Sequence, residues 1–364
     1  MPEPIPEPIR LADRVHNEIL QEISFSQHLN PVNVEAARQA FLRGAPCPPF
    51  RYKPLEQADD ALKRLDAVTH DRQHPAGALV GKCFDHTQMM IRALRDRTAS
   101  SFHLLAICNE WYPEPELMKL QFSQGTEALQ PLDVNANTLI AYLEETLADR
   151  EVQDWKVIRD PVMSARVLVD GAKRVLRVNP EARFRARDLD RLVAHEIDVH
   201  VLRSVNGQIQ PLRCFETGLP GSLTTEEGLA MVAEEKTETQ SPGVLSRQLE
   251  VLRAIQLARE MGFGELHATL SESLGPGLAW GICLRIKRGL AHPELPGVYA
   301  KDSVYLRGRM RVTKWIEDGG DLSQLYVGKV GIEDPVQEWL DQGWIQPARV
   351  LPQMWMGGRQ ASRG

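Results

Sequence analysis

The chain has 364 residues, of which 43% are hydrophobic, 25% are charged and 6% are aromatic. This composition is that of an ordinary globular protein, and it excludes the disordered, collagen-like and coiled-coil classes. Lys and Arg number 43 against 49 Asp and Glu, so the formal net charge is −6. A negative balance argues against a general polyanion binder, and we expect no nucleic-acid partner.

The five cysteines are widely scattered and form no Cys-x-x-Cys pair, so the sequence indicates neither a disulfide framework nor a thiolate zinc cluster. No uncharged apolar run reaches the roughly 18 residues that a membrane helix needs. The N-terminus also lacks a basic region followed by an apolar stretch. We therefore expect a cytoplasmic protein with no membrane partner. The sequence does not indicate an oligomeric state.

Proline density and apolar spacing divide the chain into expected parts. Prolines crowd the first residues, which have little apolar surface to bury. The parts are an extended arm at 1–9, a mainly helical part at 10–150, a second part at 151–353 that carries the candidate site, and a flexible tail at 354–364.

Capping residues followed by apolar residues at helical spacing predict helices that begin at Asn33, Asp85 and Asn137. The first of them should end before Gly44. A strand is expected at 155–158. Together with the hairpin described next, these elements predict a predominantly helical α+β fold.

Two apolar runs, 167–169 and 175–178, flank Asp170-Gly171, the dipeptide most typical of a tight hairpin turn. The edge of this hairpin could pair with an extended peptide, or it could be an ordinary sheet strand. A helix should follow at 187–203 and be closed by the Asn-Gly pair at 206–207.

The helix at 187–203 carries His195-Glu196-Ile-Asp-Val-His200, an HExxxH string one residue longer than the HExxH of ordinary zinc peptidases. At about 100° per residue, positions five apart point roughly 140° away from each other on an α-helix. Two such imidazoles cannot share one metal ion. A π-bulge returns both rings to one face, and π-bulges are frequent at functional sites. The motif therefore predicts a local π distortion.

A catalytic zinc site of the His-His-Glu type needs a third ligand, and Glu226 and Glu227 are candidates on the next predicted helix. The alternative is a capping box, in which Glu227 reaches back to the amide of Thr224 and binds no metal. Two neutral histidines and one glutamate leave a net charge of +1 with zinc. That charge brings the pKa of a bound water to about 7, and Glu196 is placed to accept its proton.

The combination of His195-Glu-x-x-x-His200 with Glu226-Glu227-Gly-Leu-Ala resembles the QEGLA-motif proteins, a family called flavohemoglobin expression-modulating in bacteria. Its animal relatives include the microtubule-associated tyrosine carboxypeptidases. Further segments that resemble this family are Arg203 with Asn206-Gly207, Arg285 to Leu290, Lys301 to Gly308, Pro31 to Asn33, Phe41-Leu42 and Pro49 to Tyr52. The likeness therefore covers most of the chain.

The resemblance implies a zincin-like metallopeptidase with one Zn²⁺ on His195, His200 and Glu227, and with Glu196 as the general base. Glu226 occupies the position that is Gln in the QEGLA form. The chain departs from the family pattern at Asp198, where a smaller residue is expected, and at Tyr299-Ala300, where Phe-Thr is usual. These departures bear on the choice of substrate more than on the chemistry.

A carboxypeptidase must bind the terminal carboxylate of its substrate, a role that suits a guanidinium or ammonium group. Arg203, Arg288 and Lys301 are the candidates. Tyr305, four residues after Lys301, is a candidate donor to the oxyanion. An exposed helix face is the alternative explanation for the basic residues near Arg288.

The function predicted from the sequence is that of a zinc carboxypeptidase, in which zinc-bound water attacks a peptide bond near the C-terminus of a peptide or protein. Two alternatives remain. One is a non-catalytic regulatory or peptide-binding protein that retains the HExxxH helix, and the other is a zinc hydrolase that acts on a non-peptide amide.

Overall fold

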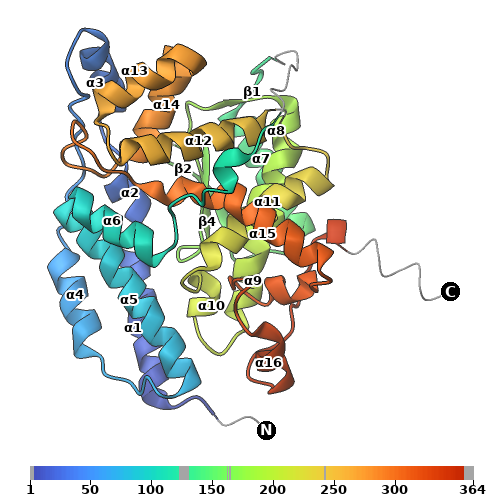
Figure 1. Ribbon diagram of the computed structural model, residues 1–364. Helices are drawn as coiled ribbons and strands as arrows, with labels where there is room; N and C mark the ends of the chain where they lie inside the picture. The colour runs from blue at the N-terminus through green and yellow to red at the C-terminus, as the bar shows by residue number, and fades with distance from the viewer. Residues whose placement is uncertain (1–3, 123–130, 162, 164, 242, 356–364) are drawn as a thin grey trace.

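The computed structural model describes residues 4–122, 131–161, 163, 165–241 and 243–355. Most of these residues are helical and the strands are short, which confirms the predominantly helical α+β class (Figure 1). Within these ranges, no helix combines the length and the apolar character needed to cross a lipid bilayer. The first helices are α1 (Glu7–Glu22), α2 (Phe25–Leu29), α3 (Val34–Leu42), α4 (Ala58–Ala67), α5 (Pro75–Asp96), α6 (Ala99–Cys108) and α7 (Ala136–Asp149), with a 3-10 turn at Leu117–Lys119.

The second half of the chain begins with the short strands and continues as helices. The strands are β1 (Val134–Asn135), β2 (Lys156–Arg159), β3 (Val167–Asp170), β4 (Val175–Val178) and β5 (Arg183–Phe184). The later helices are α8 (Ala186–Leu192), a π-helical segment (Val193–Val201), α9 (Leu202–Gln208), α10 (Cys214–Thr217), α11 (Ser222–Lys236), α12 (Val244–Ala258), α13 (Phe263–Leu274), α14 (Pro276–Lys287), α15 (Val304–Glu317) and α16 (Val336–Asp341), with 3-10 turns at Ala300–Ser303, Leu322–Tyr326 and Gln353–Trp355.

The N-terminal segment becomes helical earlier than expected. Because α1 begins at Glu7, the prediction of an extended arm at 1–9 is wrong for its last three residues. Pro8 lies in the first turn of α1, where the missing N–H of proline breaks no intrahelical hydrogen bond. Ile9 is fully buried, because α1 packs against α4 and α5.

Two of the three predicted helix starts agree with the structure to within one residue, although the cap of α7 is Asn135 and not Asn137. α3 follows Asn33 as expected, and α7 begins one residue before the expected start at Asn137. The start predicted at Asp85 is wrong, since α5 already begins at Pro75. Its N-cap is His74, which is not among the preferred capping residues, so the only start signal there is Pro75 at the first helical position.

The strands form two small sheets. β1 pairs with β5, and in the other sheet β4 lies between a parallel β2 and an antiparallel β3. The hairpin of β3 and β4 is confirmed, but four residues, Gly171 to Arg174, connect its strands in place of a tight two-residue turn. The strand expected at 155–158 is β2, one residue later. β3 is an edge strand with no strand partner on its outer side among the described residues.

The buried apolar side chains form two main clusters. One joins α1, α4, α5 and α6 to α12, α13 and α14, and the other joins α7 and the three-stranded sheet to the π-helical segment and α11. Both clusters contain residues from before and after position 150, so the expected boundary between 10–150 and 151–353 does not separate two cores. Of the tail expected at 354–364, residues 356–364 lie outside the described residues, and Trp355 donates a hydrogen bond to the Tyr326 hydroxyl.

α11 and α15 cross in the middle of the molecule with their backbones in contact (Figure 1). A Cβ atom on Gly228 would lie 2.1 Å from the carbonyl carbon of Gly308, and one on Gly308 would lie 2.0 Å from the carbonyl oxygen of Thr224. Only glycine permits this approach. Since Gly228 directly follows Glu227, the crossing also fixes the position of that glutamate.

We expect Gly228→Ala and Gly308→Ala each to destabilise the protein by about 1–3 kcal/mol, because the helices must separate to admit the methyl group. Urea denaturation measures this loss. Gly277→Ala in α14 is the matched control, since a Cβ there meets nothing within 4 Å. It should be neutral or stabilising by up to about 1 kcal/mol. Equal effects at all three positions would contradict the proposed importance of the crossing.

Candidate functional site

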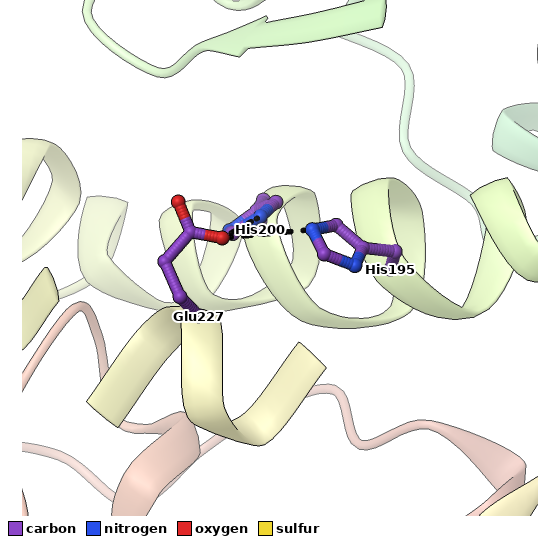
Figure 2. A group of neighbouring side chains, drawn as sticks. All are labelled: His195, His200 and Glu227. Carbon is purple, nitrogen blue, oxygen red and sulfur yellow. Dashed lines mark ion pairs between the residues drawn. The ribbon is translucent and has the colours of Figure 1, made fainter. Parts of the chain in front are cut away.

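The predicted distortion of the histidine helix is confirmed. The π-helical segment Val193–Val201 lies between α8 and α9 in one continuous helix. It places His195 and His200 on the same side, with ring centroids 5.0 Å apart, and Figure 2 shows both rings projecting together. The helix runs on to Gln208, beyond the end expected at 206–207.

A carboxylate from α11 meets the two imidazoles (Figure 2). Oε2 of Glu227 lies 3.6 Å from Nε2 of His195 and 3.7 Å from Nε2 of His200. This oxygen is buried and has no hydrogen-bond partner within the described part of the chain. The three candidate ligand atoms lie within 4.8 Å of one another. Two atoms that are each about 2.0 Å from a tetrahedral zinc are roughly 3.3 Å apart, so the donor types and their spacing fit one such ion.

The other two nitrogens of the imidazoles face different glutamates of α11. Nδ1 of His195 lies 2.8 Å from Oε1 of Glu234, and Nδ1 of His200 lies 2.7 Å from Oε1 of Glu226. Burial acts to raise the pKa of these carboxyl groups, but the neighbouring cations and histidines outweigh it and lower the pKa of Glu226, Glu227 and Glu234. Of the two adjacent glutamates, Glu227 is the one that faces both Nε2 atoms.

The capping-box alternative for Glu227 is wrong. α11 begins at Ser222 with Gly221 before it, so Thr224 is the third residue of the helix and not its cap. The Glu227 side chain reaches the histidines instead.

Glu227 is also flanked by Lys301, from the 3-10 turn Ala300–Ser303, and by Tyr305, from the first turn of α15. Nζ of Lys301 lies 2.9 Å from Oε1 of Glu227 and 5.1 Å from the centre of the Tyr305 ring. Burial acts to lower the pKa of Lys301, but the Glu227 carboxylate outweighs it and raises that pKa. Burial and then the charge of Glu227 raise the pKa of Tyr305 to about 12, so its hydroxyl keeps its proton at neutral pH.

These side chains line a cleft of about 670 Å³. Glu196 also lines it, next to the first histidine on the same helix. The edge strand and the N-terminal part supply further walls: Val167, Leu168 and Val169 from β3, and Asn30, His86, Asn109 and Trp111. The cleft therefore lies where the N-terminal helices meet the histidine helix and its sheet.

Two arginines near the end of α14 line the cleft around the buried Asp302. Arg285 donates to Asp302 from Nε and Nη2. Arg288 donates to Oδ1 of Asn30 at 3.2 Å, and its guanidinium lies over the Tyr299 ring. The Nε of Arg288 is buried and has no hydrogen-bond partner in the described ranges. Nη2 of Arg288 also lies 3.9 Å from Oδ1 of Asp302, and the side chain is 16% exposed, so part of it remains open to the cleft.

The prediction that Arg203 binds the substrate is wrong. Its side chain is fully buried, does not line the cleft, and donates to the carbonyls of Leu325 and Val330. Its nearest anion is Glu226, 3.7 Å away. Because its side chain is buried and cannot contact a ligand, Arg203 has a structural role behind the site.

The two departures from the family pattern lie beside the site. Asp198 pairs with Arg150 at the end of α7, and its backbone carbonyl accepts from Tyr326. Tyr299 is buried beneath the guanidinium of Arg288. Tyr299 therefore touches a residue that lines the cleft, and Ala300 directly precedes another, Lys301.

Two polar residues of the site were missed in the sequence. Glu234 lies seven residues after Glu227, about two helical turns, so helical periodicity alone could have placed it on the same face. Lys329, whose Nζ lies 2.9 Å from Oε1 of Glu226, comes from a loop far along the chain. No local pattern marks Lys329, because its role depends on a long-range contact.

The sequence is similar to one family model and to several named proteins. The family model "Microtubule-associated tyrosine carboxypeptidase" matches residues 43–363. Microtubule-associated tyrosine carboxypeptidase 1 of Rattus norvegicus is 31% identical over 196 residues, which are 52% of this chain and 41% of the relative, and the Homo sapiens protein of that name matches to the same extent. The Homo sapiens protein named putative tyrosine carboxypeptidase MATCAP2 is 31% identical over 153 residues, 40% of this chain and 29% of that protein.

These matches span less than half the length of the relatives. The family model, in contrast, covers nearly the whole of this chain, including both histidines and Glu227. The chain therefore belongs to the microtubule-associated tyrosine carboxypeptidase family.

Proposed function

We propose that this protein is a zinc-dependent carboxypeptidase of the zincin type that removes residues from the C-terminus of a peptide or protein. The observation that carries the proposal is the convergence of two imidazole Nε2 atoms on one buried, unpartnered carboxylate oxygen inside a cleft. The names of the relatives support the peptidase reaction, and they make a C-terminal tyrosine the first substrate to test.

In this proposal His195, His200 and Glu227 hold the metal. Bound there, zinc supplies a Lewis acid and a water of lowered pKa. Lys301 holds the second oxygen of Glu227, so that carboxylate is oriented with Oε2 towards the imidazoles.

We assign the proton transfer to Glu196 and the stabilisation of the oxyanion to Tyr305. The Glu196 carboxylate takes a proton from the attacking water and passes it to the amine that leaves. Tyr305 donates its hydroxyl proton in a hydrogen bond to the developing oxyanion. Its high pKa supports this role, because a phenol that ionised near neutral pH could not donate.

We assign the binding of the substrate's terminal carboxylate to Arg288. Its place on the cleft wall supports the assignment, because a partly exposed guanidinium there can donate to both oxygens of a carboxylate. Lys301 is already committed to Glu227, and Arg285 to Asp302. Asn30 and Trp111 line the same cleft, Asn30 accepting a hydrogen bond from Arg288 and Trp111 packing on the Tyr299 ring beneath it.

We assign the binding of the substrate's backbone to the edge strand β3. β3 lines the cleft with Val167 to Val169 and its outer side has no strand partner in the described ranges. An extended peptide can therefore add to the sheet as a further strand and lead its C-terminus towards the histidines.

Metal analysis and peptide cleavage test the reaction. We expect close to one zinc per chain in the wild type and far less in His195→Ala and Glu227→Gln, because each removes one of three protein ligands. Glu196→Gln should keep the zinc and lose cleavage of a library of peptides with varied C-termini, read by mass spectrometry. A chain that cannot be loaded with zinc would contradict the proposal. A chain that binds zinc and cleaves no peptide would favour the non-catalytic or non-peptide alternatives.

A second experiment tests Arg288. We expect Arg288→Gln to lower kcat/KM by about 10- to 100-fold, which corresponds to a charge-assisted hydrogen bond of about 1.5–3 kcal/mol. The variant should also lose the preference for free C-termini over amidated ones. Arg253→Gln, an arginine paired with Glu250 on α12, is the matched control and should behave as the wild type. If Arg288→Gln still preferred free C-termini over amidated ones, the assignment of the terminal carboxylate to Arg288 would be contradicted.

A further inference from the structure

Glutamates of a single helix, α11, lie next to both ring nitrogens of each of the two histidines. Glu227 faces their Nε2 atoms, while Nδ1 of His200 lies 2.7 Å from Glu226 and Nδ1 of His195 lies 2.8 Å from Glu234. Both outer carboxylates are buried, with exposed fractions of 5% and 4%. A buried carboxylate in contact with an imidazole restricts both the ring orientation and the site of its proton.

An ionised carboxylate can only accept hydrogen bonds, so Nδ1 of each histidine must be the donor. A neutral imidazole with its proton on Nδ1 presents the lone pair of Nε2, and both Nε2 atoms face Glu227. We propose that Glu226 and Glu234 are positioning residues that fix the two histidines in the tautomer that binds zinc through Nε2. This inference rests on the proposed function, since it concerns the same zinc site.

Glu226 is held by two cations. Nζ of Lys329 lies 2.9 Å from its Oε1, and Nη1 of Arg203 lies 3.7 Å from its Oε2. Arg203 is anchored in turn by the carbonyls of Leu325 and Val330, which flank Lys329 in the chain. The buried arginine thus holds both the glutamate and the loop that carries the lysine.

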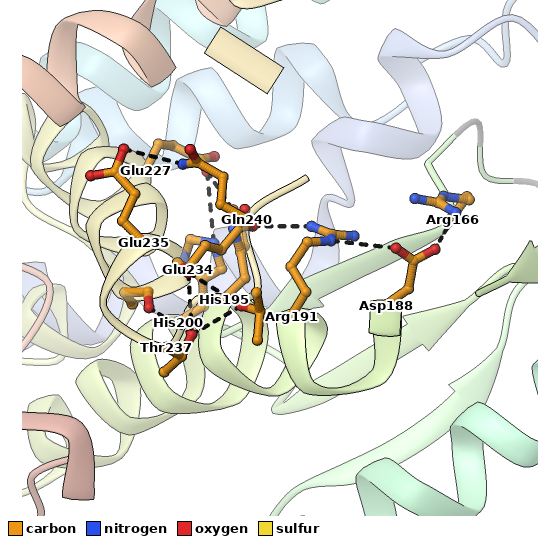
Figure 3. A network of polar contacts seen from close by, with 12 residues as sticks. Arg166, Asp188, Arg191, His195, His200, Glu227, Glu234, Glu235, Thr237 and Gln240 are labelled. Atoms are coloured by element: carbon orange, nitrogen blue, oxygen red, sulfur yellow. Dashed lines mark hydrogen bonds and ion pairs between the residues drawn. The ribbon is translucent and has the colours of Figure 1, made fainter. Parts of the chain in front are cut away.

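Glu234 is held by a chain of ion pairs that Figure 3 shows leading away from the site. Nη1 of Arg191 lies 3.0 Å from Oε1 of Glu234, the same oxygen that faces His195. Nε of Arg191 lies 3.8 Å from Asp188, and Asp188 pairs with Arg166 at 3.2 Å. The outer glutamate of each histidine therefore has its own cation.

This pairing has an electrostatic consequence. Because Lys329 and Arg191 balance Glu226 and Glu234, the outer carboxylates can accept from the histidines without lowering the net charge around the metal. The charge near the metal, on which the acidifying effect of zinc depends, is then set by Glu227 and its own partner Lys301 and not by the outer glutamates. Removing one member of such a pair exposes the charge of the other.

The test measures zinc affinity of the full chain by competition with a chromophoric chelator. We expect Glu226→Leu and Glu234→Leu to bind zinc about 10- to 100-fold more weakly than the wild type, the usual cost of losing a group that orients a metal ligand. Glu226→Gln and Glu234→Gln keep an acceptor oxygen and should lose less. Glu235→Gln is the matched control, because Glu235 lies on the same helix and pairs with Arg309 instead of a histidine.

A double variant tests the charge balance. Glu226→Gln leaves the Lys329 charge unpaired near the metal, so adding Lys329→Met should restore part of the affinity that Glu226→Gln loses. In the zinc-loaded wild type, long-range ¹H–¹⁵N NMR should show both histidines protonated at Nδ1. Coordination through Nδ1 at either histidine, or a double variant no tighter than Glu226→Gln, would overturn the proposal.

The outcomes separate this inference from the proposed function. A wild type that takes up no zinc contradicts the proposed function itself. A wild type that binds zinc, with leucine variants that melt at the wild-type temperature and bind equally well, contradicts only the positioning role. A Glu235→Gln variant that binds zinc as weakly as the leucine variants would show that any charge change on α11 disturbs the site. That result would also overturn the positioning role of Glu226 and Glu234.

Discussion

The site depends on one constraint, the five-residue interval between two histidines that must point the same way. An α-helix turns them apart, so the backbone adopts the wider π turn over Val193–Val201. The opposite side of that segment keeps the π turn in place, since Ile197, Val199 and Val201 are fully buried in a hydrophobic cluster. The irregular backbone that aligns the imidazoles is therefore stabilised by ordinary apolar packing beneath it.

The second element on which the site depends is α11, which supplies all three carboxylates that contact the imidazoles. Glu227 and Glu234 share a face two turns apart, and Glu226 lies one residue around the helix, so one rigid element reaches both sides of both rings. The contact of Gly228 with Gly308 sets the distance to α15, which carries Tyr305 and follows the turn that carries Lys301. Backbone packing at two glycines thus determines where the charges around the two histidines lie.

Electrostatic pairing runs through the whole cleft. Every buried carboxylate that touches the histidines has a cation within 3.0 Å: Lys301 for Glu227, Lys329 for Glu226 and Arg191 for Glu234. Such pairs allow several charges to be buried together, because each is compensated locally. Arg288 lines the cleft with its side chain partly exposed and its nearest ion pair, to Asp302, at 3.9 Å, whereas the fully buried Arg203 supports the structure.

The sequence by itself determined what depends on local spacing. The HExxxH interval required a π turn, and the helical α+β class followed from caps and periodicity. Local spacing left Glu226 and Glu227 as candidates, and only the family resemblance favoured Glu227. Errors arose where local signals were weak, as at the histidine cap of α5, or ambiguous, as in the proline-rich start of α1. Only the tertiary structure decided the roles of Arg203, Lys301 and Lys329. Each depends on a partner far away in the chain, and burial and pairing between distant segments leave no periodic trace in the sequence.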